Sequence, residues 1–205
     1  MTRKEEILCA TLELASEHGL KAVSMGRIAE RIGIRKASLY NHFSSRDEIV
    51  RELYGMLRKQ AQAHNPVSAQ PASAFAGSGL EEILTAALSG YTGFLSDPHL
   101  LSFFRVLYSE RSTSPTAAQI MLEETQRMID STRSLFYALV VHGKMKNADV
   151  DTAAVSYAMT IHSLIDRHMD RMTARQEAPG ITGIPDDLRA YIRWFSNLME
   201  EDANE

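Results

Sequence analysis

Apolar residues recur at helical spacing along most of the chain, and capping residues divide the pattern into segments. The first segment ends at Gly19, because glycine readily takes the left-handed conformation that closes a helix. Ser24 is a good N-cap for a second segment, in which Val23 and Ile28 have the spacing of a hydrophobic staple. Gly33 ends this segment after about two turns. The pattern therefore predicts short, closely connected helices at the N-terminus.

A third helix is predicted from about Lys36 to His42, and Ser45 and Glu48 have the spacing of a capping box ahead of a fourth helix that runs to about His64. Two short helices joined by a tight turn with glycine are the elements of a helix-turn-helix. Its second helix stands away from the body of the domain and enters the major groove of DNA. Residues 25–43 have this arrangement, so we predict that they form a helix-turn-helix.

The stretch 65–79, NPVSAQPASAFAGSG, is rich in Pro, Ala, Ser and Gly and interrupts the helical pattern. We predict a linker there, between an N-terminal domain of residues 1–64 and a larger domain of residues 80–205. In the larger domain the apolar pattern predicts a helix at about 80–95, another that starts at Asp97-Pro98, and three more at about 116–141, 150–173 and 186–201.

Alternating strand patterns bounded by hairpin turns do not occur in the sequence, so the predicted fold is all-α with about nine helices. Its three-helix N-terminal domain carries the helix-turn-helix, and a larger helical bundle follows. The segment LLSFFRVLY, residues 100–108, is apolar nearly all round, which predicts burial between neighbouring elements.

Composition narrows the class of protein. With 44% hydrophobic and 23% charged residues the chain has the make-up of an ordinary soluble protein. No apolar run is long enough to cross a bilayer, and MTRKEEIL is charged where a signal peptide needs an apolar core, so we expect a cytoplasmic location. The single cysteine, Cys9, cannot form an intramolecular disulfide and does not indicate a zinc site.

Charge is unevenly distributed along the chain. Residues 1–60 hold 11 Lys/Arg against 8 Asp/Glu, a net charge of +3, and the remaining residues hold 11 against 18, a net of -7. A basic N-terminal part on an acidic body is expected where only the first part meets phosphate.

The predicted third helix has few apolar residues, mainly Ala37, Leu39 and Phe43. Around them stand side chains capable of polar contact: Arg35, Lys36, Ser38, Tyr40, Asn41 and His42. Such a surface suits contacts with phosphates and base edges. We therefore predict that the chain binds double-stranded DNA here, with Arg27 of the second helix as a further candidate. Arg27 and Arg31 are equally compatible with solvated surface charges.

The run MGRIAERIGIRKASLYNHFSSRDEIV resembles the DNA-binding segment of the tetracycline-repressor (TetR) family. The features that carry the resemblance are Ile28-Ala29, Gly33-Ile34, Leu39-Tyr40, His42-Phe43 and Ser45-Arg46-Asp47-Glu48. The resemblance covers about residues 5–57. The remainder of the chain resembles the family only in length, helix count and lack of strands.

The resemblance implies a transcriptional regulator, a repressor that binds a palindromic operator as a homodimer. It also implies a small-molecule effector, of unknown identity, that binds in the larger domain and changes the spacing of the recognition helices. Tyr40 and His42 would contact phosphate, Lys36 and Ser38 lie where base or backbone contacts fall, and Arg46 lies at the phosphate-facing end of the fourth helix.

Two residues depart from the family pattern. Arg35 stands where Ser or Thr is usual, which exchanges a cap typically worth roughly 1 kcal/mol for a cation that can reach phosphate or guanine. Gly26 lies inside the short second helix, where it should cost roughly 1 kcal/mol relative to Ala.

The last two predicted helices carry two apolar stripes: Val155, Ala158, Ile161, Ile165 and Met169, and Leu188, Tyr191, Ile192, Phe195, Leu198 and Met199. Core packing explains both stripes. Trp194 lies beyond the second one, and this extra apolar side favours a four-helix arrangement formed by two subunits about a twofold axis. We therefore expect a homodimer through the last two helices.

Residues that would line an effector cavity are Tyr91, His99, Phe103, Phe104, Arg105, Tyr108 and Tyr137, with His162 and Asp166 one helical turn apart. Helix-core packing explains most of the aromatic residues equally well, Phe94 and Phe136 included. A satisfied polar pair explains His162 and Asp166 better than a metal site does.

Two rival functions have to be weighed. An enzyme would need His162, Asp166 or nearby carboxylates on a metal, but the sequence has no paired Glu-x-x-His motif, nucleophile elbow or phosphate loop. We expect no enzymatic activity, cofactor or bound metal. A helical ligand-binding or adaptor protein that does not bind DNA is the second rival.

Overall fold

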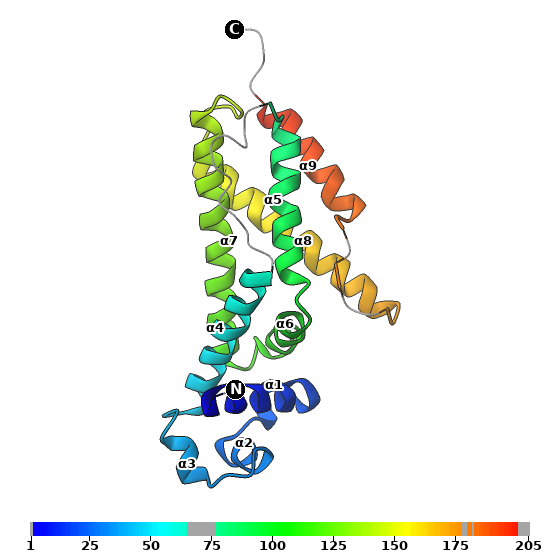
Figure 1. Cartoon of the computed structure of the whole chain (residues 1–205). Coiled ribbons are helices and arrows are strands. Elements are labelled where there is room, and N and C mark those ends of the chain that lie inside the picture. The colour runs from blue at the N-terminus through cyan, green and yellow to red at the C-terminus, as the bar shows by residue number, and fades with distance from the viewer. Residues whose placement is uncertain (1, 65–76, 178–179, 182, 201–205) are drawn as a thin grey trace. The chain divides into compact units, whose positions relative to one another are not determined.

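The computed structural model describes residues 2–64, 77–177, 180–181 and 183–200. All regular structure in this part of the chain is helical, as predicted (Figure 1). The elements are α1 (Arg3–His18), η1 (Leu20–Ala22), α2 (Met25–Arg31), α3 (Lys36–Tyr40), α4 (Arg46–His64), α5 (Leu80–Leu95), α6 (Pro98–Glu110), α7 (Pro115–Val141), α8 (Val150–Ala174) and α9 (Asp186–Met199). Most of the predicted linker, residues 65–76, lies outside the described residues.

Local capping interactions set most of the helix ends. Gly19 ends α1 with a φ of 78°, and Gly33 ends the turn after α2 with a φ of 69°. The Ser24 hydroxyl accepts from the Arg27 N–H at 3.3 Å, and the Asp97 carboxylate accepts from the N–H groups of His99 and Leu100. These short-range contacts are the ones that sequence patterns describe, which is why the predicted helix starts are confirmed. The 3-10 turn η1 was not predicted, since three residues are too few for a periodic pattern.

The chain packs into two compact units that do not follow its order. Unit 1 comprises the described residues of Met1–His64 and Asp97–Glu123, and unit 2 those of Asn65–Ser96 and Glu124–Glu205. Unit 1 thus holds α6, which packs against α1, η1 and α4. The apolar segment of α6 accounts for this, because Leu100, Phe103 and Leu107 are fully buried. A division of function at residues 65–79 stays a prediction.

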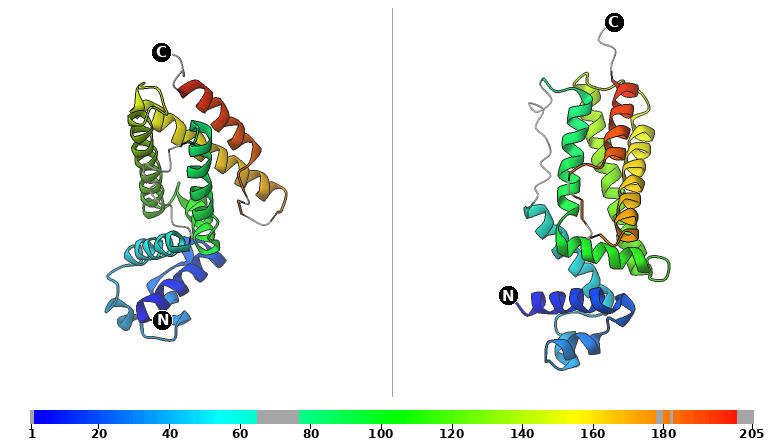
Figure 2. Two further views of the ribbon diagram at one scale, coloured as in Figure 1. Left: turned by 45° about the horizontal axis from the view of Figure 1, so that its top comes forward. Right: turned by 90° about the vertical axis from the view of Figure 1, so that its right-hand side faces the viewer.

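In unit 1 the N-terminal helices α1 to α4 lie together (Figure 2). Ile7 of α1, Ile28 of α2, Leu39 of α3 and Leu53 of α4 are fully buried in the N-terminal part. Burying such side chains stabilises the fold by about 1.5–3 kcal/mol each relative to exposure. The short helices α2 and α3 therefore depend on packing for their stability, since isolated helices of this length are unstable in water.

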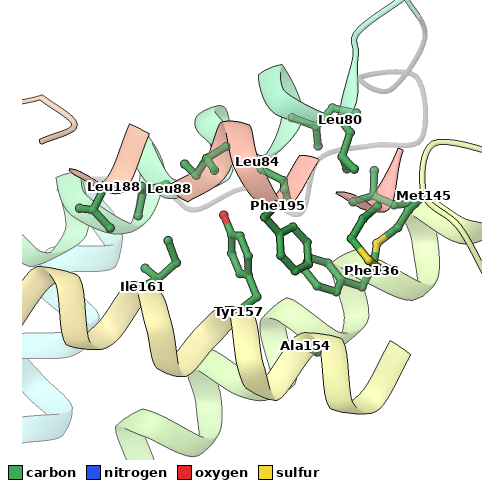
Figure 3. Packing of buried hydrophobic residues seen from close by; sticks show 14 of the residues in the cluster. Leu80, Leu84, Leu88, Phe136, Met145, Ala154, Tyr157, Ile161, Leu188 and Phe195 are labelled. Carbon is green, nitrogen blue, oxygen red and sulfur yellow. The ribbon is translucent and has the colours of Figure 1, made fainter. Parts of the chain in front are cut away.

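The core of unit 2 lies between α5, α8, α9 and the part of α7 that begins at Glu124 (Figure 3). Phe136, Tyr157 and Phe195 form its aromatic centre, with ring centroids 4.8–5.5 Å apart. Burial raises the pKa of Tyr157 well above its ordinary value. Leu84 and Leu88 of α5 lie across the cluster from α8 (Figure 3). Unit 2 is a helical bundle, as the apolar pattern predicts.

Helices α8 and α9 also expose large apolar side chains. Trp194 is 58% exposed and Leu198 54% on α9, and Val155 and Met159 are exposed on α8. We refer to these four residues as the α8–α9 apolar face. The sequence pattern placed Val155 and Leu198 on the two main stripes with the core residues, but both lie outside the core. Each stands at the margin of its stripe, where spacing alone does not separate buried from exposed positions.

Candidate nucleic-acid interface

The turn between α2 and α3 has the geometry that a helix-turn-helix requires. Ile28 and Ala29 bury the inner side of α2. After Gly33 reverses the chain, the Ile34 N–H donates to the Ala29 carbonyl at 3.0 Å and holds the start of the next segment against α2. This closes the turn within residues 31–36, so that α3 begins directly beside the end of α2.

Helix α3 is anchored by apolar side chains and exposes polar ones. Leu39 is fully buried, and Phe43 just beyond the helix is nearly so. The outward positions are Arg35, Lys36, Tyr40 and Asn41, which we call the α3 face, and all four are exposed. Ser38 and His42 are half-buried beside it, and Ala37 is exposed. The helix is thus anchored on its apolar side, and its opposite side presents cations, an amide and a phenol to solvent.

Arg35 occupies the N-cap position of α3 without acting as a side-chain cap. Its backbone is extended, with φ -72° and ψ 141°, and its carbonyl accepts from the Ser38 N–H at 2.9 Å. The guanidinium makes no capping hydrogen bond. The departure from the family pattern that the sequence shows is therefore also present in the structure, with the arginine side chain directed to solvent.

The two arginines of α2 have partners within the protein. Arg31 binds Glu17 at 2.7 Å and Glu13 at 3.2 Å, and so joins the end of α2 to α1. The hydrogen bond between them raises the pKa of Arg31 and lowers that of Glu17. Arg27 donates to the Ala22 carbonyl at 3.2 Å. Of these two residues Arg31 has its charge compensated by two carboxylates, which the sequence did not reveal.

The predicted capping box at the start of α4 forms only in part. The Ser45 hydroxyl accepts from the Glu48 N–H at 3.1 Å, as expected. The Glu48 carboxylate, however, accepts from the N–H and hydroxyl of Ser44, both at 2.6 Å, and not from the Ser45 N–H. These bonds lower the pKa of Glu48. The cap is shifted by one residue because the Ser44 side chain offers an additional donor.

Arg46, for which the family resemblance implies a phosphate-facing position, is directed into unit 1. Its guanidinium donates to the Leu20 carbonyl at 2.6 Å and lies 3.6 Å from the Asp47 carboxylate. The side chain is half-buried in the structure. Arg46 thus connects the start of α4 to the η1 turn.

The residues predicted to line an effector cavity are divided between the two units. His99, Phe103, Phe104, Arg105 and Tyr108 lie on α6 in unit 1, where Phe103 and Phe104 are buried and Phe104 meets Tyr54 with centroids 6.3 Å apart. Tyr91, Tyr137, His162 and Asp166 lie in unit 2. The predicted effector contacts thus come from both units, and their role stays a prediction.

Within unit 2 the four remaining candidates also differ in their surroundings. Tyr91 is half-buried and stacks on Phe94, whereas Tyr137 is exposed and donates to Asp151 at 3.2 Å. His162 lies 3.7 Å from Asp166, in the polar pair that the spacing predicts. Sequence reasoning did not single out Tyr157, although its helical spacing with Ala154, Ala158 and Ile161 marks it as a core residue.

The described residues contain no group of three or more His, Cys, Asp or Glu side chains that could hold a metal ion. In the same part of the chain, no helix is both long and apolar enough to cross a membrane.

Family models match both parts of the chain. Residues 7–53 match the model for bacterial regulatory proteins of the tetR family. Residues 82–195, more than half of the chain, match the model for the C-terminal domain of AefR-like transcriptional repressors. The first match includes the helix-turn-helix described above.

A curated relative resembles a short segment of the chain in sequence. The HTH-type transcriptional repressor KstR2 of Mycolicibacterium smegmatis is 36% identical over 52 residues, which is 25% of this chain and 25% of that relative. The matched segment therefore spans about a quarter of the relative's length.

Solved structures resemble nearly the whole chain. The flavonoid-responsive regulator FrrA has a TM-score of 0.71 at 20% identity and covers 98% of both chains. A TetR family transcriptional regulator from Pseudomonas syringae pv. tomato str. DC3000 has a TM-score of 0.63 at 25% identity, covering 96% of this chain and 94% of that one. The fold is thus shared over nearly the whole chain, and by the family models the chain belongs to the tetR family of bacterial regulatory proteins, with an AefR-like repressor C-terminal domain.

Proposed function

We propose that this protein is a transcriptional repressor that binds a palindromic operator as a homodimer and releases it when a small effector binds. The observation that carries the proposal is the α3 face. Its four exposed polar side chains stand on a helix held by the buried Leu39 and Phe43, directly after a closed turn. A firm helix with outward cations and amides suits insertion into the major groove.

The proposed contacts follow from exposure and chemistry. Lys36 and Tyr40 reach phosphate or base edges, and Asn41 offers an amide that can bind adenine. Arg35 can bind guanine or phosphate because its guanidinium is not used as a cap. Ser38 and His42 would contact DNA at the margin of the α3 face. Arg27 would reach the DNA backbone from α2. Arg46 would contact phosphate only if its guanidinium left the Leu20 carbonyl.

The test begins with the selection of bound sequences from a random DNA pool, followed by anisotropy titration of the recovered operator. The recovered sites should be palindromic, because two recognition helices related by a twofold axis bind equivalent half-sites. Lys36→Ala and Tyr40→Ala should each weaken binding about tenfold, since each removes contacts in both half-sites.

Lys59→Ala is the matched control, because Lys59 is an exposed lysine on α4 outside the α3 face. It should bind the operator as the wild-type protein does. Wild-type affinity in both Lys36→Ala and Tyr40→Ala would overturn the proposed interface, and selection without any recovered consensus would overturn the repressor function.

Dimerisation is proposed through the α8–α9 apolar face. Large apolar side chains that are more than half exposed, such as Trp194 and Leu198, are typical of surfaces that become covered by another protein. Val155 and Met159 add exposed apolar side chains on α8, so both of the last two helices can take part in a four-helix contact about a twofold axis.

Effector binding is proposed for unit 2, where four of the predicted contacts lie: Tyr91, Tyr137, His162 and Asp166. Reciprocity gives a test: an effector that weakens operator binding must itself bind more weakly, by the same factor, when operator is present. A flavonoid series is a reasonable first probe, because one regulator of this fold is named for its response to flavonoids. Equal effector affinity with and without operator would contradict an effector-controlled repressor.

A further inference from the structure

The η1 turn joins α1 to the helix-turn-helix and is held by side chains from two other helices. Arg46 of α4 donates to the Leu20 carbonyl at 2.6 Å. The next residue, Lys21, donates its backbone N–H to the Oε1 atom of Glu110, 89 residues away at the end of α6. Successive residues of one short turn are thus fixed from outside, immediately before Ser24 starts α2.

The absence of a side chain at Gly19 leaves room for the Glu110 carboxylate beside the turn. A Cβ atom at Gly19 would lie 2.6 Å from Glu110 Oε1, so the carboxylate occupies the space that a side chain would fill. The positive φ of Gly19 also favours glycine. Two separate features of this position, its backbone conformation and its contact with Glu110, therefore require the same residue.

The Glu110 backbone is also held by hydrogen bonds. Its carbonyl accepts from the N–H groups of Thr113 and Ser114, both at 2.9 Å, in the turn that leads to α7. Because α6 is also packed against α1, η1 and α4, the carboxylate is presented from a fixed element. Packing of α6 and the hydrogen bonds of the turn after it thus help to place the carboxylate beside η1.

Burial of the Glu110 carboxylate costs free energy. Glu110 is only 9% exposed, and its Oε2 atom has no hydrogen-bond partner among the described residues. It borders a polar cavity of about 340 Å³ that is also lined by Lys21, Arg46, Asp47 and residues 113–116. An apolar side chain would bury this site at lower cost, whereas only an acceptor can direct the Lys21 N–H. The cost indicates a role in orientation rather than in stability.

We propose that Glu110 is a positioning residue for operator binding: by holding the Gly19–Lys21 backbone it sets the direction in which α2 and α3 leave α1. The proposal rests on the DNA-binding function proposed above. Val23 transmits the position of the turn, since its N–H donates to the Leu20 carbonyl at 3.0 Å and its side chain is buried next to α2.

The test compares Glu110→Ala, which removes the acceptor, with Glu110→Gln, which keeps an oxygen of the same reach. Operator affinity should fall about tenfold in Glu110→Ala and change by less than about threefold in Glu110→Gln. Binding to unrelated DNA should stay unchanged in both, because the phosphate-binding cations are intact. The ratio of specific to non-specific affinity is the decisive readout, since a loss of folded protein would lower both.

Glu52→Gln is the charge-matched control, because Glu52 is an exposed carboxylate of the same unit. It should bind operator as the wild-type protein does. If neither the wild-type protein nor this control binds a selected operator, DNA binding itself is wrong. Loss confined to Glu110→Ala supports the positioning role.

Two further measurements test the proposal, and the first does not need a folded Glu110→Ala protein. Hydrogen exchange should show a protected Lys21 amide in the wild-type protein and in Glu110→Gln, and an unprotected one with operator affinity retained would overturn the proposal. In a double-mutant cycle, Gly19→Ala should weaken operator binding less in a Glu110→Ala background than in the wild-type one. Equal effects in both backgrounds, or a folded Glu110→Ala with wild-type operator affinity, would also overturn it.

Discussion

Helices α3 and α9 are built alike and exposed differently. Each buries one apolar side, through Leu39 in α3 and through Ile192 and Phe195 in α9. Outward, α3 presents Arg35, Lys36, Tyr40 and Asn41, whereas α9 presents Trp194 and Leu198. The buried side anchors the helix in both cases. The outward side chains therefore indicate which class of partner each helix suits. Cations and amides suit an anionic polymer, and large apolar groups suit a second protein surface.

The largest effect is expected where the α3 face depends on its buried anchor. Phe43→Ala should reduce the free energy of unfolding of the N-terminal part by about 3–5 kcal/mol, because it removes a nearly fully buried ring. Tyr40→Ala changes the same region at a position that is 49% exposed, and should cost less than about 1 kcal/mol. Denaturant unfolding followed by circular dichroism measures both. Equal losses in the two variants would show that the two sides of α3 are not distinct.

The second prediction concerns the outward side of α9. Leu198→Arg should raise the dimer dissociation constant at least about a hundredfold, because it places an unpaired charge in an apolar contact. Leu122→Arg is the matched control, since Leu122 is an exposed leucine on α7 outside the α8–α9 apolar face. Sedimentation velocity over a range of concentrations measures the association. A Leu198→Arg protein that dimerises like the wild type would exclude this face as the interface.

The third prediction separates α3 from α2 by the use of their cations. Lys36→Ala should make the negative slope of log affinity against log salt concentration shallower by about one per half-site contact, because one phosphate contact is lost. Arg31→Ala should leave that slope unchanged, since Glu13 and Glu17 already compensate its charge. Operator titrations at several salt concentrations give both slopes. A reduced slope for Arg31→Ala would mean that DNA displaces these carboxylates.

The smallest expected effects distinguish two glycines of the helix-turn-helix. Gly26→Ala should stabilise the protein by roughly 0.5–1 kcal/mol, because Gly26 lies within α2 and a Cβ there would meet only the Ser24 hydroxyl, at 4.0 Å. Gly33→Ala should destabilise it by roughly 1–2 kcal/mol, because the φ of 69° strains any residue with a Cβ. Thermal unfolding of both variants decides this, and shifts of the same sign would contradict the assignment.

The sequence was most informative where structure depends on neighbours in the chain. Helix starts at Ser24 and Asp97 and the ends at Gly19 and Gly33 follow from interactions over two to four residues, and they were predicted. The helix-turn-helix and its family also followed from a short contiguous segment. Arg35 as an uncapped helix start was visible in the same way, because a cap is a property of one position.

Side-chain partners from distant parts of the chain could not be predicted in this way. Arg31 finds Glu17 across two helices, Arg46 finds the Leu20 carbonyl, and Glu110 reaches a turn 89 residues earlier. No local pattern marks these pairs, since each depends on how α1, α4 and α6 pack. Packing likewise divided the candidate effector residues between two units and left Leu198 exposed.

The sequence by itself thus determined that the chain is helical and where its helix-turn-helix lies, and it supplied the candidate residues for DNA contact. The tertiary structure decided which of those polar residues are exposed and which make contacts within the protein. The physical reason is range: capping and periodicity act within one or two helical turns, whereas burial and ion pairing depend on residues brought together only by folding.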